Sequence, residues 1–283
     1  MKPNYSLIPR TVKNSLEEDV GAGDITAQLI ASDQLAEATI ISREKAILCG
    51  MEWAQEVYRQ VDSRVTLQWH RRDGDTLAAD QVIVTLKGPA RALLTGERTA
   101  LNWLQTLSGI ATTTRAYVDR LKGTSTQLLD TRKTIPGLRD AEKYAVRIGG
   151  GHNHRMGLYD AFLIKENHIA AAGSITAAVK QACALSKKAE GPAPWLEVEV
   201  ETLEQLQEAL SARVERIMLD NFDLPRIYKA VQLTEGRAKL EVSGNVSLST
   251  IRTVAETGVD YISVGALTKN VQAVDLSLRF IGF

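Results

Sequence analysis

The sequence predicts an α/β protein in two parts, a mixed region of about a hundred residues followed by a series of parallel βα units. Two observations support this division. The first part mixes helix-like and strand-like patterns, whereas from about Thr124 short apolar runs alternate with amphipathic helices. Near-continuous apolar strands separated by helices are typical of a parallel sheet. Six such units in succession indicate a barrel or a doubly wound sheet.

The N-terminal region is expected to contain helices on either side of strands. The helices are predicted over residues 11–20, 51–61 and 91–123. The first of them is followed by a Gly/Asp turn, GAGD. Strand patterns cover residues 36–50 and 64–90, and RDGD and KGP give turn signals within the second of these segments. This is an α+β pattern that passes into a long helical connection.

The C-terminal region contains six expected strands with apolar bodies. They are STQLLDT (125–131), DAFLIK (160–165), WLEVEV (195–200), RIMLD (216–220), KLEVS (239–243) and DYISVG (260–265). Helices are expected between the later strands, over residues 174–189, 202–213, 224–232 and 248–258.

The expected strands finish on polar residues or glycine. These ends are Asp130–Thr131, Lys165, Glu199, Asp220, Ser243 and Gly265. A single polar strand end, such as Asp220 or Ser243, is equally well explained as a loop start or helix cap. Six in succession are not, because in a parallel barrel they all emerge on the face that carries active sites. The pattern indicates an enzyme.

Composition limits the class of partner. The apolar fraction is 44% and the charged fraction 24%, and 34 basic residues balance 34 acidic ones. A protein that binds the nucleic-acid backbone usually has a basic excess, so no nucleic-acid partner is expected. Cys49 and Cys183 are distant in sequence, which fits a reducing cytoplasm rather than a disulfide framework. Without a signal-peptide core or a run of eighteen apolar residues, a membrane location is not expected either.

Cationic and imidazole side chains are concentrated in GGGHNHRMGLYDAFLIKENH, residues 149–168. His152 and His154 suggest a metal site, but no third ligand has metalloenzyme spacing, and Arg155 and Lys165 would repel a cation. An anion is the better candidate ligand. The glycines either end a helix or let the backbone approach a ligand. His168 has an equally good explanation as a residue that caps the loop after the strand.

Further cations follow the first strand of this region, where Arg132 and Lys133 leave the strand end. Arginine is suited to bidentate capture of carboxylate or phosphate, and lysine acts as a point charge. A solvated basic turn is the structural alternative. Lys165 has two functional interpretations: a Schiff-base nucleophile with a depressed pKa, or a charged residue that holds an anion.

Three glutamates alternate in the strand pattern WLEVEV and its next residue, which places Glu197, Glu199 and Glu201 on one face. In a barrel that face is the lumen, and a residue as deep as Glu197 is costly to bury unless it pairs with a cation. Glu199 and Asp220, one strand apart, are candidate ligands for Mg²⁺, which favours one or two carboxylates plus substrate phosphate.

Two short turns of small residues, SGN at 243–245 and VGA at 264–266, open helices and offer backbone N–H groups to phosphate. Together with the cations and carboxylates they predict a polyanionic ligand that carries both phosphates and carboxylates. The motifs GxGxxG, GxxxxGK[ST], HExxH and GxSxG do not occur in the sequence.

Over essentially the whole chain, these motifs resemble the quinolinate phosphoribosyltransferase family, also called carboxylating nicotinate-nucleotide pyrophosphorylases. The resemblance is carried by LEEDVGAGDIT, GERTALNWLQTLSGIAT, DTRKTIPGLRDAEKYAVRIGGGHNHRMGLYDAFLIKENHI, LEVEVE, IMLDNF, LEVSGN and ISVGALTK. It implies transfer of a phosphoribosyl group from phosphoribosyl pyrophosphate to quinolinate, with loss of pyrophosphate and CO₂, in NAD biosynthesis with Mg²⁺. It also implies an N-terminal α/β sandwich domain over residues 1–113, to which the tail 273–283 returns, and a C-terminal incomplete parallel α/β barrel over 114–272.

The resemblance also implies a homodimer, or a hexamer, in which Arg98 completes the neighbouring subunit's site. Residues on the family's dicarboxylate-binding positions are Arg132, His154, Arg155 and Lys165. Residues on positions that serve the phosphoribosyl and phosphate groups are Thr131, Lys133, Glu199, Asp220, Ser243, Gly244, Asn245, Val264, Gly265 and Ala266. Of all these, Lys165, Glu199 and Asp220 are the candidate catalytic residues. Asn270 stands where many members have histidine, and His152 lies at a variable position.

Three alternatives remain at this stage. The nearest is a sister phosphoribosyltransferase of the same fold that acts on another substrate. The second is a Schiff-base aldolase on a full barrel, in which Lys165 would be the nucleophile. The third is a non-catalytic sensor of a phosphate ligand. Enzymes and a binding protein are distinguished by turnover, and the two enzyme chemistries by covalent trapping of the lysine.

Overall fold

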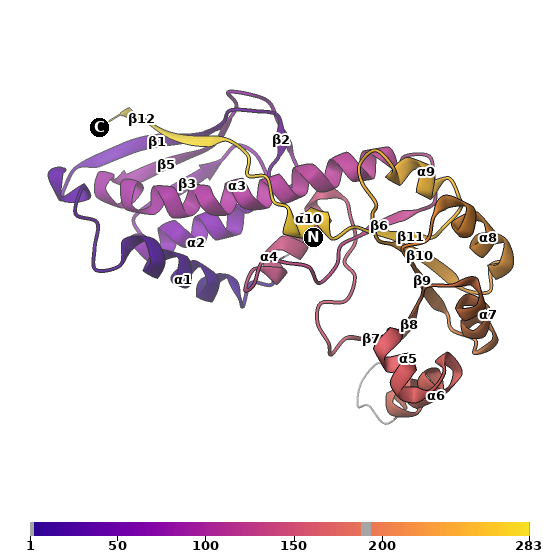
Figure 1. The fold of residues 1–283 in the computed structure, drawn as a ribbon. Coiled ribbons are helices and arrows are strands. Elements are labelled where there is room, and N and C mark those ends of the chain that lie inside the picture. Colours follow the sequence, from indigo (N-terminus) through magenta and orange to yellow (C-terminus); the bar gives the residue numbers. More distant parts are fainter. Residues whose placement is uncertain (1–2, 188–193, 283) are drawn as a thin grey trace. The chain divides into compact units, whose positions relative to one another are not determined.

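The computed structural model describes residues 3–187 and 194–282, and these residues fold as two compact units (Figure 1). The first unit comprises the chain up to Arg115, the segment Thr134–Gly150, and the chain from Ala266 onward. The second comprises Ala116–Lys133 and Gly151–Gly265. The division between the units after Arg115 falls within a continuous helix, Ala90–Arg120.

A four-stranded antiparallel sheet forms the body of the first unit, in the order β12-β1-β5-β3. These strands are β1 (Leu35–Ser42), β3 (Thr66–Trp69), β5 (Val82–Pro89) and β12 (Leu276–Gly282). The C-terminal tail therefore lies beside β1, with Ile40 opposite Leu278. A second, two-stranded pairing joins β2 (Ala46–Ile47) to β4 (Thr76–Leu77).

Three helices lie along one side of this sheet (Figure 1). They are α1 (Ile8–Val20), α2 (Met51–Val61) and α3 (Ala90–Arg120). The short 3₁₀ helix η1 (Ala27–Leu29) follows α1, and α4 (Arg139–Gly149) and α10 (Ala266–Lys269) complete the unit. Gly96 of α3 has the ring of Tyr58 so close that an added Cβ would lie 2.7 Å from it, which explains a small residue in mid-helix.

The second unit is a six-stranded parallel sheet in the order β6-β11-β10-β9-β8-β7. Its strands are β6 (Gln127–Leu129), β7 (Ala161–Ile164), β8 (Trp195–Val200), β9 (Arg216–Asp220), β10 (Lys239–Ser243) and β11 (Tyr261–Ser263). Its helices are α5 (Glu166–Ala172), α6 (Ile175–Ser186), α7 (Leu203–Ser211), α8 (Leu224–Thr234) and α9 (Ile251–Ala255). All six strands that the sequence predicted are confirmed.

The edge strands β6 and β7 do not pair with each other, so the barrel is incomplete in the described residues. The chain that connects α4 to β7 partly fills this gap. His152 forms a parallel bridge to Leu129, which extends the sheet beyond β6. The mixed α/β architecture, with an antiparallel and a parallel unit, agrees with the fold class that the sequence predicted.

The helix predictions are confirmed in position, with shifted ends. The helix over 51–61 matches α2, and that over 202–213 contains α7. Sequence analysis missed α5, a short helix that directly follows Lys165. The end of the helix expected over 174–189 lies outside the described residues. Among the described residues no single helix is long and apolar enough to cross a membrane, and only the bent pair α5 with α6 meets that requirement, by length and composition alone.

Candidate active site

The carboxyl ends of β7 and β8 bring a lysine and a glutamate together. Lys165 follows β7 directly, and its Nζ lies 2.5 Å from Oε2 of Glu199 near the end of β8. The lysine side chain is 43% exposed and the glutamate side chain 10%. The lysine is thus charge-paired but still reached from solvent, as expected for a residue that meets an anionic ligand.

His168 has the capping role that was one of its two explanations. Its Nδ1 accepts the backbone N–H of Lys165, and Lys165 is the N-cap of α5. This bond from the third helical residue back to the N-cap backbone fixes the turn that carries the lysine. His152 is exposed, and its backbone N–H and carbonyl bond to β6. Both histidines therefore have structural roles beside the strand ends.

Asp130 anchors the segment that crosses from β6 toward β7. This residue is fully buried, and its carboxylate accepts the Asn153 side chain at 2.5 Å and the backbone N–H of His154 at 2.9 Å. Further along, the Asp160 carboxylate accepts the N–H groups of Met156 and Gly157. Because both ends of this segment are bonded, Arg155 between them is held on a fixed backbone.

Two arginines come together at this point. Arg155 is 9% exposed, and one of its Nη atoms donates to the carbonyl of Ala161. Burial lowers the pKa of the Arg155 guanidinium, and the charge of Arg132 lowers it further, whereas Asp160 and the glutamates of β8 act in the opposite direction. The arginines after β6 and in the crossing segment are therefore electrostatic neighbours, which makes this a cationic site.

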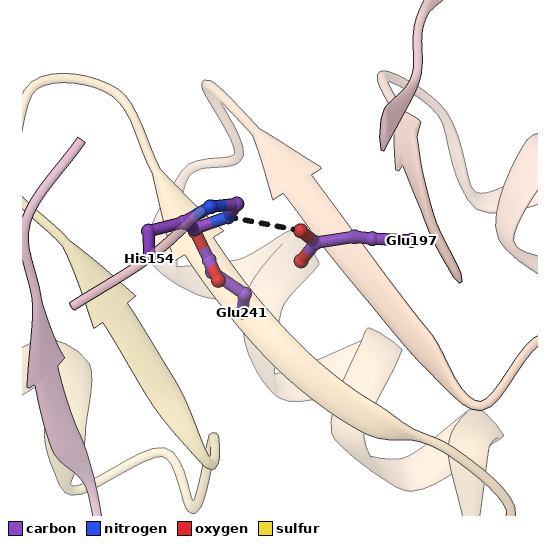
Figure 2. Close-up of side chains that lie close together, drawn as sticks. All are labelled: His154, Glu197 and Glu241. Carbon is purple, nitrogen blue, oxygen red and sulfur yellow. Dashed lines mark hydrogen bonds and ion pairs between the residues drawn. The ribbon is translucent and has the colours of Figure 1, made fainter. Parts of the chain in front are cut away.

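The lumen of the barrel contains a buried cluster below this cationic site. Nε2 of His154 lies 3.0 Å from Oε2 of Glu197 and 3.7 Å from Oε1 of Glu241 (Figure 2). Both carboxyl groups are fully buried. Arg216 donates from Nε to Glu197 at 3.0 Å and from Nη2 to Glu241. The sequence-based prediction that Glu197 pairs with a lumen cation is confirmed, and the cation is Arg216.

The ionisation of this cluster follows from its burial. Burial raises the pKa of Glu241 to about 7, Glu197 adds to the rise, and His154 and Arg216 oppose it. Burial also raises the pKa of Glu197, again against the charge of Arg216. Burial alone would lower the pKa of Arg216, but the two carboxylates hold it above its ordinary value. The single guanidinium of Arg216 is thus paired with two carboxyl groups, and the raised pKa of Glu241 favours its protonated form.

His154, Glu197 and Glu241 form the three-residue group whose ligand atoms lie close enough, within 4.8 Å, to hold a metal ion among the described residues. The hydrogen bonds argue against that use. Nδ1 of His154 accepts the N–H of Arg155 at 2.7 Å, so the ring proton lies on Nε2, the atom that faces the carboxylates. A metal at Nε2 would require the other ring tautomer, which breaks the hydrogen bond from Arg155, and Arg216 already supplies positive charge to the carboxylates.

The carboxyl ends of β8 and β9 carry a group of acidic side chains. Glu201 is exposed, and its pKa is raised by a hydrogen bond with Glu166 and by the charges of Asp220 and Glu199. Such mutual repulsion is relieved by a cation. Asp220 accepts a hydrogen bond from the side chain of Asn221 at 2.8 Å. The donor set of carboxylate oxygens suits Mg²⁺ that completes its coordination with water and phosphate.

The first of the two turns expected to bind phosphate contains two residues with positive φ. Gly244 has φ +92°, and a Cβ there would lie 2.2 Å from Oδ1 of Asn221, so only glycine fits. Asn245 also has positive φ, and its side chain donates to the same oxygen at 3.3 Å. Ser243 precedes this pair at the end of β10.

The second turn is only partly available to a ligand. The N–H of Val264 donates to the carbonyl of Leu129, so this residue holds the turn to β6. Gly265 lies under Lys133, whose Cδ would be 2.9 Å from an added Cβ. Oγ1 of Thr131 accepts the N–H of Lys133. Thr131 and Lys133, which follow β6, thus lie close to Gly265, which follows β11. The backbone N–H of Val264 is not free for phosphate.

Arg98 lies on α3 of the first unit and is exposed. Asn270, where many members of the family have histidine, is also exposed, directly after α10.

Two family models match the chain and together cover most of it. The C-terminal domain of quinolinate phosphoribosyl transferase matches residues 110–279, and its N-terminal domain matches residues 24–108. The chain belongs to the quinolinate phosphoribosyltransferase family. A probable carboxylating nicotinate-nucleotide pyrophosphorylase of Bacillus subtilis is 44% identical over 97% of this chain and 94% of its own length. A chloroplastic enzyme of that name from Oryza sativa is 40% identical over 98% of this chain and 78% of its own.

Solved structures of the quinolinate phosphoribosyltransferase family agree with this assignment. The nicotinate-nucleotide pyrophosphorylase of Francisella tularensis is 47% identical, covers 99% of this chain and 98% of its own, and has a TM-score of 0.92. NadC from Streptococcus pyogenes is 40% identical, covers 100% and 99%, and has a TM-score of 0.95.

Within this family fold, sequence reasoning missed Arg216 and Glu241. Glu241 has a signal that went unused, because it is an acid inside the apolar strand KLEVS, as Glu197 is inside WLEVEV. Arg216 is the first residue of β9 and resembles an ordinary charged strand start.

Proposed function

We propose that this protein transfers the phosphoribosyl group of phosphoribosyl pyrophosphate to quinolinate, with release of pyrophosphate and CO₂, to give nicotinate mononucleotide for NAD biosynthesis. The proposal is carried by the family match over both domains, together with a cationic group at the strand ends in which burial, and then the charge of Arg132, lowers the pKa of Arg155. Like charges are held together at a cost unless a ligand neutralises them. Quinolinate, with two adjacent carboxylates, is suited to a pair of guanidinium groups.

The reaction itself follows from positioning and charge. As pyrophosphate leaves, C1 of the ribose becomes oxocarbenium-like, and Glu199 or Asp220 stabilises that positive charge. The pyridine nitrogen attacks C1 and becomes a pyridinium. When CO₂ leaves, its bonding electron pair stays on the adjacent ring carbon, where the pyridinium charge stabilises it until that carbon takes a proton from water. Lys165 neutralises anionic substrate while it remains a primary ammonium, and no covalent enzyme intermediate is needed.

Phosphate and metal binding are assigned to the remaining strand ends. The turn Ser243–Asn245, together with Thr131, Lys133 and Gly265, is proposed to bind the phosphoribosyl and phosphate groups. Mg²⁺ is proposed to be held by Glu199 and Asp220, directly or through water. When bound it neutralises the pyrophosphate. Ala266, directly after this group, is proposed to contribute its backbone to the same phosphate site.

The assembly is proposed to be a homodimer, with a hexamer as the alternative, in which Arg98 completes the dicarboxylate pocket of its neighbour. Exposure of Arg98 supports this role, since an arginine that serves another subunit must be accessible before assembly. The cytoplasmic location expected from two distant cysteines stays a prediction; Cys49 and Cys183 are both free.

The proposed function is tested by release of pyrophosphate and CO₂ from quinolinate, phosphoribosyl pyrophosphate and Mg²⁺. Wild-type protein should turn over, and Arg132→Ala should lose about 100-fold or more in kcat/KM, because one charge-assisted bidentate contact contributes about 3 kcal/mol. Release of neither product by the wild type would contradict the proposal.

Two further measurements separate the alternatives. Equal use of nicotinate and quinolinate would favour a sister phosphoribosyltransferase, because nicotinate lacks one carboxylate. Borohydride trapping of Lys165 with substrate would favour a Schiff-base mechanism. Binding of phosphoribosyl pyrophosphate without any turnover would favour a sensor.

A further inference from the structure

The lumen cluster connects to the proposed dicarboxylate pocket through one residue. His154 leaves the crossing segment with its ring in the lumen, where its side chain is 6% exposed. Its Nε2 faces Glu197, and its Nδ1 accepts the N–H of Arg155. The imidazole thus bridges a buried carboxylate and the backbone of a pocket arginine.

The two hydrogen bonds of the His154 ring require one particular tautomer. An imidazole nitrogen that accepts a hydrogen bond carries no proton, so the proton of a neutral ring lies on the other nitrogen. In His154 that proton points to a carboxylate oxygen, and the acceptor nitrogen is left for Arg155. A ring in the other tautomer would lose both bonds at once.

Both ring nitrogens of His154 are engaged within the protein. The ring also packs edge-on against Trp195, with centroids 5.2 Å apart. Its effect on a ligand is therefore indirect.

Arg216 holds the acids in place. It donates to an oxygen of Glu197 and to one of Glu241, and its guanidinium lies 4.7 Å from the ring centroid of Trp195 and 4.3 Å from that of Tyr261. A guanidinium between two aromatic faces and two carboxylates has little freedom. The carboxylate of Glu197, which accepts the hydrogen bond from His154, is consequently fixed.

We propose that Glu197, Glu241 and Arg216 are positioning residues for dicarboxylate binding, which act through the Nε2–H tautomer of His154 to fix the backbone of Arg155. The role rests on the proposed function, since it assumes that Arg155 binds quinolinate. None of the three residues needs to touch substrate.

Glu197→Gln is the sharpest variant. The glutamine keeps the shape but offers one oxygen where two are in use, so either Arg216 or His154 loses its acceptor. Quinolinate should bind between about tenfold and 100-fold more weakly, as misplacement of a binding group predicts. The KM for phosphoribosyl pyrophosphate should change less than about twofold, because the phosphate turns lie on other strand ends.

Glu241→Gln tests whether the effect becomes smaller with distance from His154, and Asp260→Asn is the control. Oε1 of Glu241 is 3.7 Å from Nε2 of His154, so its variant should weaken quinolinate binding less than Glu197→Gln does. The carboxylate of Asp260 accepts hydrogen bonds from Lys239 and from the N–H of Leu240 on the same sheet, and these contacts do not involve the histidine. Asp260→Asn should leave both substrate constants unchanged.

Calorimetry with quinolinate and steady-state kinetics give these constants. Equal losses for both substrates in Glu197→Gln, or a lower melting temperature with unchanged quinolinate binding, would show a merely structural cluster and overturn the proposal. Wild-type protein that fails to bind quinolinate would contradict the proposed function instead, and this role with it.

A second test observes the His154 ring of the wild-type protein directly and does not depend on activity. The chain has 4 histidines, so ¹⁵N-histidine labelling gives a small set of ring signals, and His154→Asn identifies the one that matters. The proposal requires a neutral ring with its proton on Nε2. A proton on Nδ1, an imidazolium at neutral pH, or loss of the Nε2 proton on stoichiometric addition of Zn²⁺ would overturn it; the last result would assign a metal site.

Discussion

Glu197 and Glu199 lie two residues apart on the same face of β8 and have opposite surroundings. Glu197 is fully buried and bonds Arg216 and His154, whereas Glu199 is partly exposed and bonds the half-exposed Lys165. The strand alternation makes them neighbours on one face. The position of a glutamate along the strand therefore decides its role. Glu197, deep in the lumen, holds Arg216 and His154 in place, whereas Glu199, at the end of the strand, is proposed to interact with substrate and metal.

The largest effect should come from removal of the lumen cation. Arg216→Met leaves two buried carboxyl groups without their guanidinium, and a broken buried pair costs about 3–5 kcal/mol of unfolding free energy. Denaturant unfolding measures this loss. Lys165→Met, the matching change at the rim, should cost less than about 1 kcal/mol because that pair is partly solvated. Equal losses at the two depths would refute the distinction.

Activity should show the opposite order. Glu199→Gln removes the charge that we propose faces the reacting ribose, and it should lower kcat/KM about 100-fold, the usual size for one electrostatic contact to a transition state. Its unfolding free energy should stay within about 1 kcal/mol of wild type. Steady-state kinetics and denaturant unfolding on the same preparation give both numbers. A Glu199→Gln variant with full activity would remove the rim acid from the mechanism.

A third buried acid sharpens the comparison, since Glu142 on α4 has no guanidinium bonded to it among the described contacts. Its Oε2 accepts the N–H of Ile135, and its Oε1 has no hydrogen-bond partner in the described structure. Burial raises the pKa of Glu142 to about 7, against the Ile135 hydrogen bond and the charge of Arg139. The folded state therefore holds a proton that the unfolded state releases near pH 4.5.

The sign of the resulting pH dependence follows directly. The contribution of Glu142 to the free energy of unfolding is fully present below about pH 4.5 and is lost as pH rises through about 7, because the folded state binds more protons than the unfolded state over that range. Glu142→Gln keeps the acceptor and removes the titration. Its advantage over wild type in unfolding free energy should grow by about 2 kcal/mol between pH 5 and pH 8. Parallel unfolding curves at both pH values would contradict the assignment.

The strands and their polar ends were predictable from the sequence, because they depend on hydrophobic periodicity. The need for a cation beside Glu197 was predictable too, because it depends on the cost of a buried charge. The sequence did not predict that Arg216 is this cation. In the parallel ladder Glu197 lies directly opposite Arg216. That register depends on how α7 and its loops return the chain to the sheet, which local patterns do not determine. The ring position of His154 depends in the same way on the bonds of Asp130.

The smallest expected effect concerns the aromatic side of the lumen cation. Tyr261→Leu removes one of the two rings that flank Arg216, while Trp195 stays on the other side. A cation–π contact of a partly buried arginine contributes about 1 kcal/mol. Tyr261→Phe keeps a ring face and should recover most of that loss in denaturant unfolding. If leucine and phenylalanine behave alike, the carboxylates alone fix the guanidinium, and the difference between lumen and rim reduces to charge pairing and burial.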